Sequence, residues 1–104
     1  MSQDFFKTYQ AKFQALADEK RLQILYELCQ NGKSCVCDLS EIMEIPQSKL
    51  SYHLRILLDV GLIQKEIKGT WSYYELNHPV INALLSEELC CIFRGMENCC
   101  NHSN

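Results

Sequence analysis

Apolar residues recur every three or four positions on both sides of a proline near the middle of the chain. Before the proline, one helical face is formed by Val36, Leu39, Ile42 and Met43. After it, a second face is formed by Leu50, Leu54, Leu57 and Leu58. Proline disfavours helical backbone at the preceding residue and is tolerated in a first helical turn, so Ile45 and Pro46 mark a turn between two helices. The pattern predicts a helix-turn-helix over residues 36–58.

The second of these helices has a polar side that is rich in hydrogen-bond donors and almost free of acids. This side comprises Gln47, Ser48, Lys49, Ser51, Tyr52 and Arg55, with His53 on or near it. Side chains of these types contact base edges in the major groove and DNA phosphates. We therefore predict a recognition helix. Its expected base contacts are Gln47, Ser48, Ser51 and Tyr52, and its expected phosphate contacts are Lys49 and Arg55.

Two runs of β-branched and aromatic residues follow this helix. They are LIQKEI (residues 62–67) and WSYYEL (residues 71–76), separated by Lys68, Gly69 and Thr70. Such runs around a glycine-containing turn predict a β-hairpin. A hairpin directly after a recognition helix would form a wing, and we expect Lys65 and Lys68 to contact the DNA backbone from it. The alternative is a plain surface hairpin whose aromatic residues pack on the core.

Amphipathic helices are also predicted on both sides of this unit. In residues 4–16, an aromatic stripe contains Phe5, Phe6, Tyr9, Phe13 and Leu16. The next helix begins after an N-cap at Asp18 and ends at Gly32, and its expected buried side is Leu22, Ile24, Leu25 and Leu28. A last helix starts near Pro79 and continues to Gly95 through Ile81, Leu84, Leu85, Leu89 and Ile92.

The first and last helices carry more apolar surface than a three-helix core with a wing needs to cover. Association of two copies through these helices would bury the excess. It would also place two recognition helices about one DNA turn apart. The predicted fold class is therefore mainly α with a β-hairpin: a winged helix-turn-helix that forms a homodimer through its first and last helices.

The length of 104 residues fits one domain and not two. We expect a DNA-binding and dimerisation domain over residues 1–96 and a cysteine-containing tail over residues 97–104. No apolar run approaches the ~20 residues that span a bilayer and no signal-peptide pattern is present, so we expect a cytoplasmic protein with no membrane partner. The net charge is −3, but residues 47–73 carry four basic and two acidic side chains, so a local charge of +2 coincides with the predicted DNA face.

Six of the seven cysteines fall into two clusters. They are Cys35 and Cys37 at the start of the first motif helix, and Cys90, Cys91, Cys99 and Cys100 near the end of the chain. C-x-C and C-C pairs differ from the spacing of common zinc modules. A helix start favours thiolates, and Cys35 and Cys37 can share an ion only if Cys35 lies at or before the N-cap. Clustered thiolates select soft metals or metalloids. The alternative is that Cys35 and Cys37 are small packing residues, which is what we expect for the seventh cysteine, Cys29.

The segments SCVCDL, ALADEKRLQILYEL, PQSKLSYHLRIL, VGLI and GTWSYYEL follow one another in an order that resembles the ArsR/SmtB family of winged-helix metal-sensing repressors. With SEELCCIF and a later CC pair, the chain is most similar to the arsenical-resistance operon repressors of that family. The resemblance implies a homodimer that binds double-stranded operator DNA and leaves it when As(III) or Sb(III) binds cysteine thiolates. It also implies that Cys35 and Cys37 are ligands and that Gln47, Ser48, Ser51, Tyr52 and His53 lie on the recognition helix.

The chain departs from one version of the family's arsenic site, because Ser40 stands where a third local thiol would be. The sensor either lies wholly in the carboxy-terminal cysteines or joins both clusters. Two alternative functions also stay open: a cadmium, lead or zinc sensor with four thiolates, and a thiol redox protein. No C-x-x-C accompanies a βαβ pattern, so we expect neither an enzyme nor a permanent cofactor.

Overall fold

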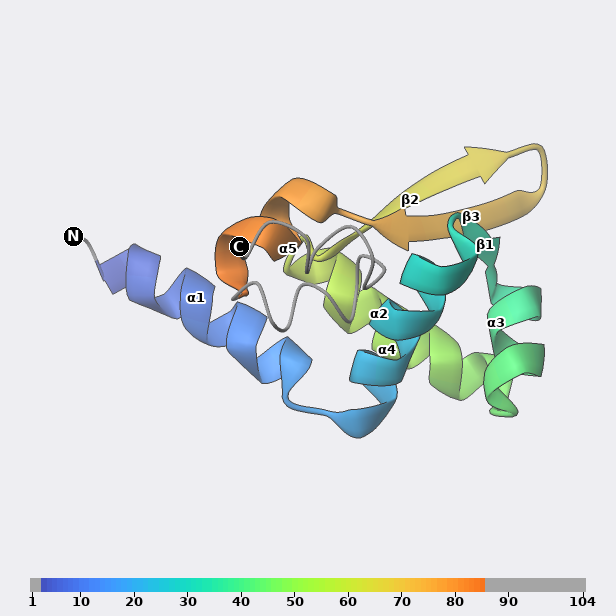
Figure 1. The fold of residues 1–104 in the computed structure, drawn as a ribbon, viewed down its shortest axis with the longest axis horizontal. Coiled ribbons are helices and arrows are strands. Elements are labelled where there is room, and N and C mark those ends of the chain that lie inside the picture. The colour runs from blue at the N-terminus through green and yellow to red at the C-terminus, as the bar shows by residue number, and fades with distance from the viewer. Residues whose placement is uncertain (1–2, 86–104) are drawn as a thin grey trace, which may run out of the picture.

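Five helices and a three-stranded antiparallel sheet make up residues 3–85, the part of the chain that the computed structural model describes (Figure 1). The helices are α1 (Gln3–Leu16), α2 (Glu19–Asn31), α3 (Val36–Met43), α4 (Gln47–Asp59) and α5 (His78–Leu84). The strands are β1 (Ser34–Cys35), β2 (Ile63–Lys68) and β3 (Trp71–Leu76), and β3 lies between the other two. The predicted helix-turn-helix followed by a hairpin is therefore present, as α3, α4 and the β2–β3 pair.

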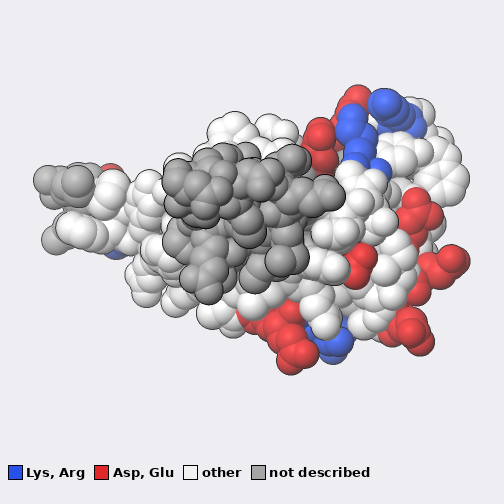
Figure 2. Space-filling model, in the orientation of Figure 1, with Lys and Arg blue, Asp and Glu red and all other residues white. Residues whose placement is uncertain are grey.

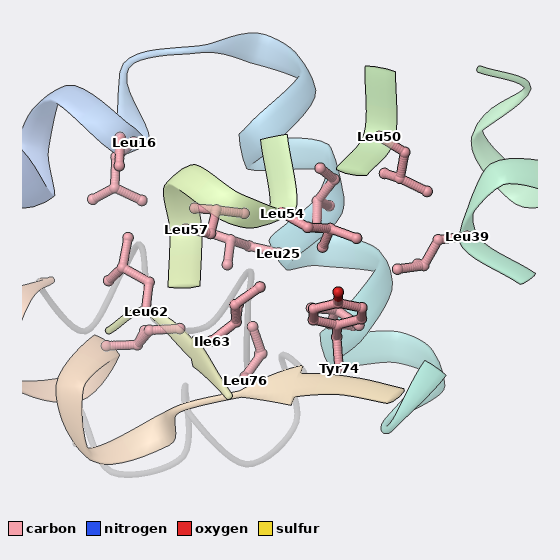
Figure 3. Packing of buried hydrophobic residues seen from close by; sticks show 14 residues of the cluster. Leu16, Leu25, Leu39, Leu50, Leu54, Leu57, Leu62, Ile63, Tyr74 and Leu76 are labelled. Atoms are coloured by element: carbon pink, nitrogen blue, oxygen red, sulfur yellow. The ribbon is translucent and has the colours of Figure 1, made fainter. Parts of the chain in front are cut away.

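One core joins all of these elements. The inner side of α4 consists of Leu50, Leu54 and Leu57, each at most 1% exposed. Figure 3 shows these side chains pointing toward Leu25 of α2, Leu39 of α3 and Tyr74 of β3. Each fully buried leucine contributes roughly 1.5–3 kcal/mol to folding. The helical spacing of these leucines thus fixes which side of α4 is buried and which side stays free.

The turn between α3 and α4 is held by two local features. Glu44 adopts left-handed backbone (φ 56°), which ends α3. The Ser40 hydroxyl donates a hydrogen bond of 2.5 Å to the carbonyl of Ile45, and the Ile45 amide donates one of 3.3 Å back to the carbonyl of Ser40. Pro46 then caps the start of α4 in extended backbone, as expected for proline next to a helix start. Ser40 therefore has a structural role at the position where a third local thiol is missing.

Three expectations about the helices are corrected. Leu22 and Ile42 were expected to be buried but are 40% and 46% exposed, because each lies at the edge of its helical stripe and not at its centre. The last helix ends at Leu84, where the extended backbone of Leu85 stops it. Its predicted continuation to Gly95 and the predicted tail of residues 97–104 lie outside the described residues. The short strand β1 was not predicted.

The amino-terminal helix and α5 lie together at the end of the molecule opposite the hairpin tip (Figure 1). They line a cavity of about 270 Å³ whose walls include Tyr9, Lys12, Val80 and Leu84. On α1, the aromatic residues Phe5, Phe6 and Phe13 are 40%, 62% and 52% exposed. The predicted aromatic stripe is thus present and largely uncovered within one copy. Within residues 3–85, no helix has the length and apolar character needed to cross a membrane.

Candidate nucleic-acid interface and thiol pair

The side of α4 that faces away from the core carries the predicted DNA contacts. Eight of the nine predicted residues are exposed, namely Gln47, Ser48, Lys49, Ser51, Tyr52 and Arg55 on α4, and Lys65 and Lys68 on β2. Tyr52 of α4 has an aromatic ring as well as a hydroxyl group, and 62% of its surface is exposed. Hydroxyl, amide and guanidinium donors thus share one accessible helix surface, which is the arrangement that base and phosphate contacts need.

The ninth residue, His53, is a correction. It is 5% exposed and lies inside the molecule, because it follows Leu50 by three positions and precedes Leu57 by four, so that it shares their inner stripe. The Arg21 guanidinium lies 3.1 Å from Nδ1 of His53. A guanidinium only donates hydrogen bonds, so Nδ1 accepts and the ring proton resides on Nε2. His53 therefore supports α4 from its inner side and is not part of the exposed side that carries the other eight residues.

Arg21 and Asp18 connect this histidine to the rest of the fold. Arg21 Nε donates a hydrogen bond of 2.7 Å to the carbonyl of Ala15 near the end of α1, and its backbone amide donates one of 3.0 Å to Asp18. The Asp18 carboxylate, which caps α2 as predicted, lies 4.0 Å from Nδ1 of His53. The backbone hydrogen bond from Arg21 lowers the pKa of Asp18. This cluster joins α1, α2 and α4, and no local sequence pattern predicts the contact between Arg21 and His53, which are 32 residues apart.

Burial governs the titration of His53. Desolvation lowers the pKa of His53, and the charges of Arg21, Lys49 and Lys20 lower it further, whereas Asp18 opposes them. The neutral imidazole is therefore the form that the fold holds. Protonation would place a second positive charge beside the guanidinium of Arg21 at the base of α4.

The wing carries an ion-pair chain that the sequence analysis missed. Glu66 accepts a hydrogen bond from the Lys33 ammonium and lies 4.0 Å from that of Lys68. The hydrogen bond from Lys33 lowers the pKa of Glu66, and the same contact raises the pKa of Lys33. Glu66 and Lys68 are two residues apart on β2 and therefore lie on the same side of the strand, so their proximity was predictable from the sequence. The contact with Lys33 was not predictable, because it depends on strand β1. Lys65 lies 5.9 Å from the ring centre of Tyr74.

Charge is unevenly distributed over the visible surface. Figure 2 shows basic and acidic side chains together at the hairpin, and acidic side chains over α3. The acidic residues of α3 and its cap are Asp38, Glu41 and Glu44, and all three are exposed. A phosphate backbone would therefore be repelled from the outer side of α3, and the lysines of the hairpin are the positive charges near it.

The two thiols at the start of α3 occupy different environments. Cys35 is the N-cap, with extended backbone and 8% exposure, so it meets the condition that it lie outside the helix. Its backbone also pairs with Tyr73 of β3. Cys37 is exposed, and its sulfur accepts a hydrogen bond from Nε2 of Gln47 at 3.6 Å. The thiol pair thus contacts both the wing strand and the first residue of α4.

Within residues 3–85, no three histidine, cysteine or acidic side chains are grouped closely enough to hold a metal ion. Cys35 and Cys37 supply two thiols, one fewer than As(III) takes when it is fully bound by cysteines. Cys90, Cys91, Cys99 and Cys100 lie outside the described residues, so a site that joins both clusters stays a prediction. Cys29 is half-buried against the core, as expected for a packing residue.

Comparisons with known proteins give one consistent result. The family model "Bacterial regulatory protein, arsR family" matches residues 18–65. The chain is 67% identical over 99 residues to an arsenical resistance operon repressor from Bacillus subtilis, covering 93% of this chain and 94% of that protein. Among solved structures, HlyU from Vibrio cholerae has a TM-score of 0.69 and 32% identity, covering 81% of this chain and 89% of HlyU.

A second solved structure is similar in fold alone. It is a possible ArsR-family regulator from Mycobacterium bovis, described as a homodimeric winged helix-turn-helix DNA-binding domain. Its TM-score is 0.70 at 23% identity, and the match covers 98% of this chain and 89% of that one. The winged helix-turn-helix architecture therefore extends beyond the close relatives of this chain.

The burial of His53 predicts a pH dependence of stability. Because the folded protein holds His53 neutral while the unfolded chain protonates near pH 6.5, stability is fully present above that pH and falls as the pH decreases below it. Urea unfolding at pH 7.5 and pH 5.5, at equal protein concentration, measures the loss. His53→Gln, which cannot gain a charge, should lose less stability than the wild type over this interval. An equal loss in both proteins would show that His53 does not carry the effect.

Proposed function

Because the chain belongs to the ArsR family of bacterial regulatory proteins, we propose that it is an arsenic-responsive transcriptional repressor that binds operator DNA as a homodimer. Members of this family are transcriptional regulators and not enzymes. The observation that carries the proposal is the 67% identity to an arsenical resistance operon repressor over nearly the whole of both chains. The exposed donor surface of α4 and the two exposed lysines of the hairpin support it independently.

The DNA contacts that we propose follow from exposure and chemistry. Gln47, Ser48, Ser51 and Tyr52 are exposed on α4 and carry the groups that recognise base edges. Lys49 and Arg55 extend from the same helix toward phosphates, and Lys65 and Lys68 extend from the wing. Two recognition helices in a dimer would read two half-sites, as in other helix-turn-helix regulators.

Homodimerisation is supported by the uncovered apolar surface of α1. Three of its aromatic side chains are at least 40% exposed, and a cavity separates α1 from α5. Exposed apolar surface of this kind marks association surfaces in monomeric folds. A second copy that packs on α1 and α5 would cover it and would leave the start of α4 and the hairpin tip free at the other end of each protomer.

The inducer that we propose is As(III) or Sb(III), bound through cysteine sulfur. Cys35 and Cys37 bring two thiols to the start of α3, and a third must come from the carboxy-terminal cysteines of the same or the second copy. Thiolate ligands without histidine favour soft ions of this type. Binding would then join the motif helix to the end of the chain and change the placement of α4.

Recognition by α4 predicts different effects for base and phosphate contacts. Gln47→Ala and Tyr52→Ala should each reduce discrimination between operator and random DNA, by about 1–3 kcal/mol for Gln47 if it contacts adenine with two hydrogen bonds. Lys68→Ala should weaken binding to all sequences and reduce the salt slope by about one. Fluorescence anisotropy over a salt series measures both, with Lys7→Ala on α1 as the control. Wild-type binding by both α4 variants would show that this helix does not read the operator.

Dimerisation through α1 predicts a selective effect of charge on its aromatic side. Phe6→Glu should convert the free protein from dimer to monomer and weaken operator binding, because one half-site supplies too little contact area. Gln14→Glu adds the same charge at an exposed position of α1 outside the aromatic stripe and should leave the dimer intact. Sedimentation equilibrium measures the association state. A fully dimeric Phe6→Glu protein would place the interface elsewhere.

Sensing through thiolates predicts that operator release depends on one or both cysteine clusters. A Cys35→Ser, Cys37→Ser double variant and a variant with all four carboxy-terminal cysteines replaced by serine should each bind operator DNA, and at least one should no longer be released by arsenite. Cys29→Ala should be released like the wild type. Anisotropy of labelled operator, with and without arsenite, gives the result. Wild-type release by both cluster variants would rule out the thiolate mechanism, and loss in the carboxy-terminal variant alone would make Cys35 and Cys37 packing residues.

A further inference from the structure

Within residues 3–85, a hydrogen bond connects one predicted sensing residue, Cys37, to one predicted DNA-reading residue, Gln47. Gln47, the first residue of α4, donates from Nε2 to the sulfur of Cys37 over 3.6 Å. Both side chains are exposed, so neither is held in place by packing alone. The contact spans the turn of the helix-turn-helix, from the first turn of α3 to the first turn of α4. It therefore constrains the direction in which the Gln47 amide points.

We propose that Gln47 is a positioning residue that transmits the state of the Cys37 sulfur to the start of the recognition helix. The inference rests on the proposed function, because it assumes that Cys37 binds As(III). In the unliganded protein the Cys37 sulfur accepts from Gln47 and orients its amide. In the liganded protein arsenic takes the place of the thiol hydrogen, and the As–S bond reorients the sulfur away from the Gln47 amide.

The chemistry of the exchange is balanced and involves no change of oxidation state. The Cys37 thiol replaces one hydroxyl group of arsenous acid: its S–H bond and one As–O bond break, an As–S bond forms, and the proton leaves with the hydroxide as water. The sulfur keeps its two lone pairs, so the contact with Gln47 is lost because the Cys37 side chain reorients toward arsenic, and not because the sulfur has fewer acceptor sites. The Gln47 amide must turn toward another partner, and its presentation to a base edge changes with it.

The other cysteine of the pair, Cys35, is held in place by the sheet. Cys35 is held in β1 by pairing with Tyr73 of β3, and it is 8% exposed. The start of α3 is therefore anchored to the sheet through Cys35, while the Cys37 side chain is linked to α4 by an exposed hydrogen bond from Gln47. A change at Cys37 acts on the less constrained of the two connections. Linkage requires that operator binding in turn alters the affinity of this thiol for its ligand.

The test compares the release factor, defined as the ratio of operator Kd values with and without saturating arsenite. Gln47→Met keeps the length of the side chain but removes its donor. The control Gln23→Met makes the same change at an exposed position on α2. A second control, Tyr52→Ala, removes a proposed base contact and leaves the thiol contact intact. Arsenite stoichiometry is measured for each variant by titration of the free protein.

The wild type and both controls should show a release factor in the range typical of allosteric coupling, roughly 5- to 150-fold. In Gln47→Met the factor should fall at least about threefold, with unchanged arsenite stoichiometry. A wild-type release factor in Gln47→Met would overturn the proposal while leaving arsenic sensing intact. A wild type that arsenite does not release would instead overturn the proposed function, and the coupling with it.

A measurement without DNA separates coupling from base recognition. In the free, arsenite-free protein, Cys37→Ala should shift the NMR signal of the Gln47 side-chain amide and leave that of Gln23 in place. A role confined to base contacts would not produce this shift. An unmoved Gln47 signal would show that the hydrogen bond is not formed in solution, and would overturn the proposal.

Discussion

The rest of the structure depends on the division of α4 into a buried apolar side and an exposed polar side. Its leucines at positions 50, 54 and 57 are buried against α2, α3 and the sheet, so any rotation of the helix about its axis would expose apolar surface. The opposite side is thereby fixed toward solvent, where Gln47, Tyr52 and Arg55 project. The core thus sets the direction of the proposed DNA contacts before any DNA is present, which would reduce the entropy lost on binding.

Most of the fold followed from spacing, and the errors have physical explanations. Helical periods and the position of Pro46 located α3 and α4, because burial of a stripe is a local property of the chain. The helical period is compatible with His53 on the inner stripe, but its polar ring favoured the DNA side in the sequence-based prediction. The buried ring is paired with Arg21, which is 32 residues away, and local sequence patterns do not predict such a contact. Strand β1 has two residues and no pattern of its own, since it exists only through pairing with β3. The candidate site was predictable as a set of side chains, whereas the link from Gln47 to Cys37 depends on the geometry of the turn.

The turn between α3 and α4 brings the proposed sensing residues Cys35 and Cys37 close to the proposed DNA contacts of α4. Ser40 closes it through the carbonyl of Ile45, and the left-handed backbone of Glu44 directs the chain into α4. A rigid turn makes the positions of the two helix starts interdependent, because neither can shift without straining these bonds. A ligand at the start of α3 therefore needs little displacement to affect the start of α4. Coupling of a few kcal/mol is sufficient for a regulatory response.

The distribution of charge determines how much of the affinity is sequence-independent. Phosphate contacts supply non-specific binding. Lys68 of the hairpin lies 4.0 Å from the Glu66 carboxylate, which also pairs with Lys33, so the positive charge of Lys68 is partly offset. The acidic side chains of α3 face outward beside the same hairpin and repel phosphates. Both features lower attraction to arbitrary DNA more than they affect base contacts from α4. In the proposed repressor, whose net charge is −3, contacts from α4 must therefore supply a larger share of the operator affinity than phosphate contacts do. A shift at the start of α4 would then remove the part of the binding free energy that distinguishes the operator from other DNA.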